Sequence, residues 1–474
     1  MIILTTDHSQ LTIMTRIPTI AIFDVGKTNK KLFLFDEQFK IVFRESKQLK
    51  ETTDEEGFSC EDVMALTQWV KDSFDRILKD EQFCIKAVNF SAYGASFVYL
   101  DSEGKVMLPL YNYIKPVSQQ LQKKFYDEYG GKSLIGQQTA SPALGHLNSG
   151  MQLYRLKYEK PEAFAKIKYA LHLPQYLSFI LSSKINSDIT SIGCHTYLWD
   201  FQKQKYHKWV KQEGIGDKLP PVLGCTEIAG FADGNIPVGV GLHDSSAALI
   251  PYLISFAEPF ILLSTGTWCI SLNPFNDSPL SDYELLNDCL CYLSYEGKPV
   301  KASRLFAGYE HEQQIRTLAK QFNKPVDYFK TVIYNNQLLN RLKSADKKPQ
   351  GHNSPDVAGQ FLFSKRKLSE FSTYEEAYHQ LMSDIMTQQI RSTHLALKGT
   401  TIKRIFVDGG FSRNSIYMHL LADAFPGIQV YTATVPESSA MGAALAIHQH
   451  RNKYPQPTDI IELKYYPDQQ AAKH

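Results

Sequence analysis

The stretch TIAIFDVGKTN, residues 19–29, is the part of the sequence from which the fold can be worked out. Its first five residues are apolar or β-branched, and Asp24-Val25-Gly26 then forms a turn signal. Two more short apolar runs follow at 31–35 and 41–44. The stretch therefore predicts three antiparallel strands, with the carboxylate of Asp24 at the end of the first.

The turn after Asp24 has two interpretations. Backbone N–H groups of Gly26, Lys27 and Thr28 can cradle a phosphate, and the Asp24 carboxylate can hold Mg²⁺ or its water shell. In a plain hairpin, the aspartate would only cap the turn. A P-loop is excluded, because its first glycine would fall at Ala21 and a strand, not a helix, is expected after the turn.

The order strand, turn, strand, helix, strand occurs twice along the chain. In the first half, an amphipathic helix at 61–78 and a strand at 87–91 follow the opening strands. The second half contains strands at 260–263, 268–272 and 404–407 and a long helix at 374–397. This weak repeat predicts two α/β domains of one kind, at 17–244 and 245–465.

Two segments rich in turn-forming residues complete this organisation. Residues 223–244 contain five glycines and one proline and are expected to join the halves. Residues 343–354 are polar and are expected to form an exposed loop.

Composition restricts the class of protein. The chain has 474 residues, 43% of them hydrophobic, and a net charge of only +2, so we expect neither nucleic acid nor a membrane as partner. Seven scattered cysteines without C-x-x-C spacing indicate neither a zinc site nor a disulfide framework. These features favour a cytoplasmic protein.

Three later segments could carry chemistry. Asp244 is expected at or near the N-cap of a small-residue helix, where it could be an ordinary cap or a general base for a hydroxyl group. Gly266 and Thr267 lie in a turn that could receive phosphate or simply join two strands. Gly409 and Gly410, followed by Asn414, leave room for a flat base or ribose, or serve only the backbone of the turn.

Together these segments resemble the FGGY family of carbohydrate kinases. The resemblance runs from about Thr19 to His448 and rests on five motifs in order. They are Phe23-Asp24-Val25-Gly26, Gly241-x-x-Asp244, Ser264-Thr265-Gly266-Thr267, Asp408-Gly409-Gly410-x-x-x-Asn414 and Glu437-x-x-Ala440-x-Gly442-Ala443-Ala444.

The resemblance implies two RNase H-like domains of the actin-like ATPase type, with a catalytic cleft between them. It implies ATP and Mg²⁺ as cofactors, with Asp244 as catalytic base and both Asp24 and Asp244 as metal carboxylates. Gly26, Lys27, Thr28, Gly266 and Thr267 would line the phosphates, and Gly409, Gly410 and Asn414 the adenosine. We expect the two carboxylates to face each other across a gap that can close.

The expected sugar site lies mainly on the first domain, close to Asp244. Tyr93, Ser96 and Asn112 are the expected neighbours of the sugar, because they follow strands that should face the cleft. The family's usual turn, Asp-x-Gly-Thr-x-Ser-x-Arg, is altered here, with Lys27, Asn29 and Lys31 in place of Thr, Ser and Arg.

The substrate class follows from the branch of the family that the chain resembles. Residues 147–150 and 188–193 look most like the branch near L-fuculose and L-rhamnulose kinases, which implies a ketose or deoxy-ketose substrate. Alternatives are a kinase for xylulose, ribulose or another polyol, an actin-like or chaperone-type ATPase, and a sugar-responsive binding protein without catalysis. A homodimer is one expected arrangement.

Overall fold

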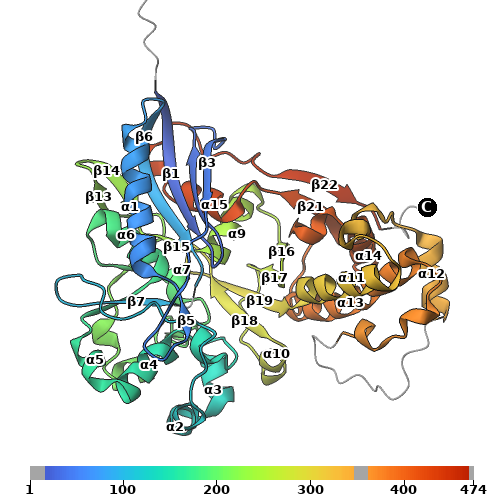
Figure 1. Ribbon diagram of the computed structural model, residues 1–474, viewed down its shortest axis with the longest axis horizontal. Helices are drawn as coiled ribbons and strands as arrows, with labels where there is room; N and C mark the ends of the chain where they lie inside the picture. The colour runs from blue at the N-terminus through green and yellow to red at the C-terminus, as the bar shows by residue number, and fades with distance from the viewer. Residues whose placement is uncertain (1–15, 95, 346–360, 469–474) are drawn as a thin grey trace, which may run out of the picture.

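The computed structural model describes residues 16–94, 96–345 and 361–468, so most of the expected loop at 343–354 lies outside the described residues. Within these ranges the chain forms two seven-stranded sheets, each with helices packed against it. The first sheet lies on the left of Figure 1 and the second extends to the right. This arrangement confirms the predicted pair of α/β units.

The first sheet has the order β13-β14-β6-β1-β2-β3, and β15 also pairs with β6. The strands β1, β2 and β3 are antiparallel, whereas β6 runs parallel to β1, β14 and β15. The bounds are β1 (Ile17–Val25), β2 (Lys30–Phe35), β3 (Ile41–Lys47), β6 (Phe83–Ala92), β13 (Ile228–Ala232), β14 (Ile236–Gly239) and β15 (Leu242–His243).

Helix α1 (Val63–Lys79) covers one face of this sheet, and local sequence explains where it begins. The Asp62 side chain accepts hydrogen bonds from the N–H groups of Met64 and Ala65, which would otherwise lack helical partners. Buried apolar residues spaced three and four apart, such as Leu66 and Val70, then pack on the sheet.

The remaining elements of the first half lie beside this sheet. The helices are α2 (Gln119–Tyr129), α3 (Gly131–Gln138), α4 (Gly150–Glu159), α5 (Pro161–Lys166), α6 (Leu173–Ser182), α7 (Ile189–Ile192) and α8 (Lys208–Gln212). The short strands are β4 (Thr52–Thr53), β5 (Ser59–Cys60), β7 (Phe97–Leu100), β8 (Tyr169–His172), β9 (Ser187–Asp188), β10 (Trp199–Asp200), β11 (Lys205–Tyr206) and β12 (Val222–Leu223).

The second sheet has the order β18-β19-β17-β16-β20-β21-β22 and repeats the plan of the first. Strands β16 and β17 are antiparallel, like β1 and β2, and β20 runs parallel to β16, as β6 does to β1. The strands are β16 (Phe260–Thr265), β17 (Cys269–Asn273), β18 (Cys289–Leu293), β19 (Pro299–Leu305), β20 (Arg404–Gly409), β21 (Gln429–Thr434) and β22 (Glu462–Tyr466). The predicted repeat is therefore present.

Helices of the second half pack on this sheet. The predicted helix at 374–397 is confirmed as α13 (Tyr374–Leu397), which is largely buried. The others are α10 (Asp282–Leu286), α11 (Ala307–Gln321), α12 (Asn336–Ala345), α14 (Ser415–Ala424) and α16 (His448–Arg451).

Residues 223–244 lead into α9, which begins at Asp244, but they are more than a connection between the halves. They form β13, β14 and β15, which belong to the first sheet. Of the residues that suggested a linker, Gly230, Gly234, Pro237 and Gly239 lie in the β13–β14 hairpin. Asp233 and Gly234 between β13 and β14 both have positive φ, as a tight hairpin turn requires.

The two halves are joined through α9 (Asp244–Ser255) and α15 (Ser438–Ala446), which lie between the sheets in Figure 1. The helices cross so closely that a Cβ on Gly442 would lie 1.8 Å from the Ala247 carbonyl oxygen. Helix α15 also contacts β1 and β6, and the Asn89 side-chain amide donates to the Ala443 carbonyl. One apolar core therefore runs through both halves.

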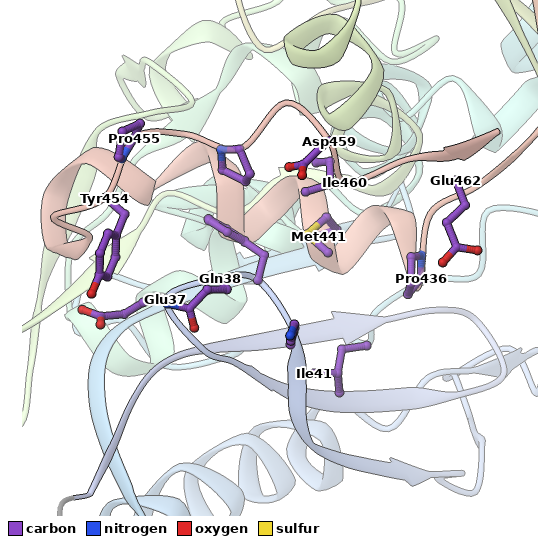
Figure 2. Close-up of a pocket in the computed structure, with 13 residues that line it drawn as sticks. Glu37, Gln38, Ile41, Pro436, Met441, Tyr454, Pro455, Asp459, Ile460 and Glu462 are labelled. Atoms are coloured by element: carbon purple, nitrogen blue, oxygen red, sulfur yellow. The ribbon is translucent and has the colours of Figure 1, made fainter.

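A cavity of about 840 Å³ opens on the outer side of this junction. Figure 2 shows Glu37, Gln38 and Ile41 from the β2–β3 hairpin facing Met441 of α15 and Tyr454 of the segment after it. The residues that the sequence predicts as catalytic or binding are not among those lining this cavity.

We predict that Gly442→Ala lowers the free energy of unfolding by about 1–3 kcal/mol, because the added methyl group has no space at the helix crossing. Urea denaturation measures the change. Gly216→Ala is the matched control, since a Cβ there would meet only Val210 atoms at ordinary contact distance. Equal stability of Gly442→Ala and the native protein would contradict the close crossing.

Candidate active site

Asp24 and Asp244 come together because three parallel strands end at one edge of the first sheet. Asp24 is the penultimate residue of β1, and Asp244 directly follows β15 as the first residue of α9. Both strands pair with β6 between them. Asp24 and Asp244 therefore lie at the same edge of the first sheet, with β6 between their strands. That their carboxylates face each other across a gap that can close stays a prediction.

Burial makes both carboxyl groups harder to ionise, and the charge of Asp244 adds to this effect at Asp24. Desolvation raises the pKa of Asp244 from 3.8 to about 6, although hydrogen bonding from Ser245 opposes the rise. Desolvation and then the charge of Asp244 raise the pKa of Asp24 to about 6. The Ser439 hydroxyl, from α15, donates to Asp24 Oδ1 at 3.0 Å. Each aspartate is thus half ionised near pH 6 rather than near pH 4.

The turn after Asp24 is a hairpin between β1 and β2, closed by the Gly26 N–H donating to the Asn29 carbonyl at 2.9 Å. The ammonium group of Lys27 lies 2.8 Å from Glu51. Lys31, at the position where the family has arginine, pairs with Glu437 at 2.7 Å, immediately before α15. The hairpin thus carries one lysine in its turn and one in its second strand, and each is paired with a glutamate.

A second turn, Thr265-Gly266-Thr267, connects β16 and β17 in the other half. Neighbouring backbone approaches it so closely that side chains are excluded at two positions. A Cβ on Gly308 would lie 1.8 Å from the Gly266 carbonyl oxygen, and one on Gly409 would lie 1.9 Å from the Thr265 carbonyl oxygen. The glycines keep bare backbone around this turn, as a site for a phosphate requires.

A cavity of about 810 Å³ begins at this turn and extends along the second half. Gly266, Gly308, Gly410 and Asn414 contribute to its lining, together with Phe329 and Phe411. The Asn414 side chain caps α14 by accepting from the Ile416 and Tyr417 N–H groups. Gly409 follows Asp408 with φ of 89°, which fits the predicted glycine turn.

A separate cavity of about 780 Å³ lies between the halves, next to Asp244. His243 and Ser245, the neighbours of Asp244 in the chain, line it, as does Thr267. Since the adjacent residue Gly266 lines the other cavity, the two cavities adjoin at the Thr265–Thr267 turn.

Aromatic rings and uncharged imidazoles contribute eight of the twenty residues that line the cavity next to Asp244. The rings belong to Tyr93, Tyr113, Trp268, Tyr292 and Phe306. Desolvation lowers the pKa of His146 to about 4, and those of His195 and His243 to about 3, so the imidazoles are neutral at pH 7.

The two cationic side chains of this cavity are already paired. Arg304 binds Asp288 at 2.6 Å, and the buried Lys115 binds Asp54 and Glu56. A lining of this kind suits an uncharged polyol.

The sequence-predicted sugar neighbours separate in the structure. Tyr93 lines the cavity next to Asp244, whereas Ser96 and Asn112 are buried and are not among its lining residues. Sequence reasoning missed Trp268, Arg304 and Phe306, which come from the second half. Trp268 directly follows the Thr265–Thr267 turn, and Arg304 and Phe306 lie at the end of β19. These positions at strand ends could have indicated that the residues belong to the site.

The carboxylates fit a magnesium ion that is held partly by a nucleotide. Among the described residues, no group of three or more His, Cys, Asp or Glu side chains is arranged to hold a metal ion. Mg²⁺ is commonly bound by one or two carboxylates together with substrate phosphates and water. Asp24 and Asp244, at one sheet edge, supply that donor set.

Comparison with known proteins then decides the family. Residues 19–250 match the N-terminal domain, and residues 257–455 the C-terminal domain, of the FGGY carbohydrate kinases. The chain belongs to the FGGY family of carbohydrate kinases. It is a sugar kinase, and kinases of this family use ATP as phosphate donor, so the actin-like and chaperone-type ATPase alternatives are set aside.

Individual relatives are distant but similar over almost the whole length. A protein of Halalkalibacterium halodurans named rhamnulokinase is 23% identical over 93% of this chain and 95% of its own. A probable L-xylulose kinase of Pasteurella multocida is 24% identical over 91% and 90%. The crystal structure of a carbohydrate kinase from Novosphingobium aromaticivorans has a TM-score of 0.78 and 24% identity, covering 96% and 95%.

Two further observations bear on the chain's environment. All seven cysteines lie among the described residues and are free thiols, as their scattered spacing predicts. Within the part of the chain that the structure describes, no helix combines the length and apolarity needed to cross a membrane.

We predict that Asp244→Asn lowers the pKa of Asp24 below its value of about 6, because the substitution removes the neighbouring negative charge. Titration of ¹³C-labelled aspartate carboxyl groups by NMR measures this shift. Asp127→Asn, at an exposed ion pair on α2, is the control and should leave it unchanged. An unaltered Asp24 pKa in Asp244→Asn would show that the carboxylates do not interact.

Proposed function

We propose that this kinase phosphorylates a ketose or deoxy-ketose such as L-rhamnulose or L-fuculose, with ATP and Mg²⁺, and that Asp244 is the catalytic base. The observation that carries the proposal is the place of Asp244. It lies between His243 and Ser245, which line the sugar-sized cavity, and Thr267 of the Thr265–Thr267 turn lines the same cavity. A base there reaches both the attacking hydroxyl and the phosphates.

The nucleotide would occupy the cavity of the second half. Gly410 and Asn414, which line this cavity, would surround the adenosine together with the neighbouring Gly409. Gly266, which also lines it, and Thr267, which lines the cavity next to Asp244, would receive the phosphates through backbone N–H groups and a hydroxyl. From the first half, Asp24, Gly26, Lys27 and Thr28 would complete the phosphate site. Asp24 and Asp244 would hold Mg²⁺ together with phosphate oxygens, and the ion would supply charge neutralisation on the transferring group.

Asp244 has the ionisation that a base for this reaction needs. With a pKa raised to about 6 by burial, its carboxylate is mostly ionised at pH 7.5 yet more basic than an exposed aspartate. It would accept the proton of the sugar hydroxyl as the hydroxyl oxygen bonds to the γ-phosphorus. The proton would then be held by the Asp244 carboxyl group, and the bond between the γ-phosphorus and the ADP oxygen would break.

The substrate proposal rests on the uncharged character of the cavity. Its imidazoles are neutral and its lysine and arginine are paired, so a sugar acid or sugar phosphate would find no free cation among the described lining residues. Aromatic walls suit the apolar face of a sugar ring or chain. Because relatives are named rhamnulokinase and L-xylulose kinase, rhamnulose and xylulose are favoured as candidate substrates over other polyols.

The proposed division of labour follows the two halves. Residues 17–244 would form the sugar side with the base, and 245–465 the nucleotide side. Because second-half residues such as Trp268 and Phe306 also line the sugar cavity, approach of the halves would enclose the sugar. Closure would then exclude water and suppress hydrolysis of ATP.

A panel of sugars tests the substrate class. We expect sugar-dependent ADP release, in a coupled assay, with L-rhamnulose, L-fuculose or L-xylulose, and none with gluconate, whose carboxylate would lack a free cation in the cavity. ADP release that does not depend on sugar would support an ATPase instead. Absence of turnover with every sugar would support a binding protein.

We predict that Asp244→Asn lowers kcat about 10²–10⁴-fold while nucleotide still binds, because the amide cannot accept the hydroxyl proton.

In the native enzyme, kcat/KM should fall as pH drops through about 6, since protonation of Asp244 removes the base. Steady-state kinetics between pH 5 and 8 measure this fall in kcat/KM. A flat profile, or near-native turnover of Asp244→Asn, would remove Asp244 from this role.

A further inference from the structure

The Lys30 side chain is buried in the first half, directly behind the Asp24 turn. Only 1% of the residue is exposed, which is exceptional for a lysine. Its ammonium group forms an ion pair with Glu61, which is 4% exposed. It also donates to the carbonyl oxygens of Gly26 and Lys27, at 3.2 and 3.0 Å.

These carbonyl contacts orient the turn proposed to hold the phosphates. In a trans peptide the carbonyl and the following N–H point in opposite directions. Since the carbonyls of Gly26 and Lys27 point inward to Lys30, the N–H groups of Lys27 and Thr28 point away from the buried ammonium. They thus face the open side of the turn, where a phosphate oxygen can accept from them.

Glu61 connects the same lysine to the cavity next to Asp244. The Tyr93 hydroxyl donates to Glu61 Oε2 at 2.9 Å, while the Tyr93 ring lines that cavity. Burial and the Glu61 charge raise the pKa of Tyr93 well above its ordinary value, so its hydroxyl remains a donor. The Tyr93 N–H also donates to the Val25 carbonyl, inside the Asp24 turn segment.

We infer that Lys30, Glu61 and Tyr93 form a buried positioning network that fixes the phosphate-binding orientation of the Gly26–Thr28 turn and connects it to the sugar cavity. Lys30 acts through the backbone of the turn and touches no substrate. The inference rests on the proposed nucleotide and sugar sites. This role explains why Lys30 and Glu61 are buried as a charged pair, although an apolar pair would cost less to bury.

The double variant Lys30→Met/Glu61→Gln tests the positioning role. Removing both charges avoids leaving one of them buried without a partner, and so preserves folding better than either single change. We expect a melting temperature close to that of the native protein, with the Kd for Mg²⁺ and the non-hydrolysable ATP analogue AMP-PNP raised at least tenfold. Calorimetric titration without sugar measures this Kd independently of turnover.

The chain offers a matched control in its second half. Lys301 and Glu284 form another buried lysine–glutamate pair, at 2.8 Å, away from the Asp24 turn. Lys301→Met/Glu284→Gln should leave the Kd for AMP-PNP within twofold. Folded Lys30→Met/Glu61→Gln protein with an equally unchanged Kd would overturn the inference, and so would equal weakening in both double variants.

Tyr93→Phe tests the connection to the sugar cavity. The variant keeps the ring in the cavity wall and removes only the hydroxyl that contacts Glu61. In the native protein, we expect the sugar that is turned over to increase the affinity for AMP-PNP. In Tyr93→Phe, the ratio of the Kd for AMP-PNP without sugar to the Kd with sugar should be at least threefold smaller. An unchanged ratio of the Kd values with and without sugar would overturn the connection.

These outcomes are separable from the proposed function. If no sugar is turned over but the Kd of Lys30→Met/Glu61→Gln rises as expected, the substrate assignment fails and the positioning role stands. If sugars are turned over while this Kd is unchanged, the kinase stands and the positioning role fails.

Discussion

The parallel pairing of β1 and β15 with β6 is the constraint on which the site depends. It brings Asp24 and Asp244, 220 positions apart in the numbering, to one edge of one sheet. The second half is held against that edge by the crossing of α9 and α15 and by the Ser439 hydroxyl on Asp24. Because α9 begins at Asp244 itself, the helix that joins the halves also carries the proposed base. The contacts between the halves and the carboxylates thus share the same two helices.

Much of the fold could be predicted because local sequence specifies it. The opening strands, the Gly266 and Gly409 turns and the 24-residue helix α13 follow from apolar periodicity and glycine placement. Residues 223–244 could not be assigned in this way, since glycine and proline occur both in linkers and in hairpins at the edge of a sheet. Pairing with a strand distant in sequence decides between the two, and local pattern does not contain that information.

The site was partly predictable for the same reason. Asp24, Asp244 and the glycine turns stand at strand ends, where function in such folds concentrates. That Asp24 and Asp244 share one sheet edge depends on strand order and could not be read from their spacing in the sequence. Lys30 and Glu61 were missed because charged residues are ordinarily exposed, and only the structure reveals them as buried partners. Arg304 and Phe306 were missed because the second half closes a cavity assigned to the first.

In the proposed function, a nucleotide occupies the cavity of the second half and a neutral sugar the cavity next to Asp244, and the two cavities adjoin at the Thr265–Thr267 turn. A crystal structure with bound AMP-PNP, Mg²⁺ and an accepted ketose tests this most directly. The account predicts adenosine beside Gly409 and Asn414, a sugar hydroxyl within hydrogen-bond distance of Asp244, and the γ-phosphate between Asp24 and the Thr265–Thr267 turn. A nucleotide in the outer cavity near Glu37 and Tyr454, or a sugar out of reach of Asp244, would contradict it.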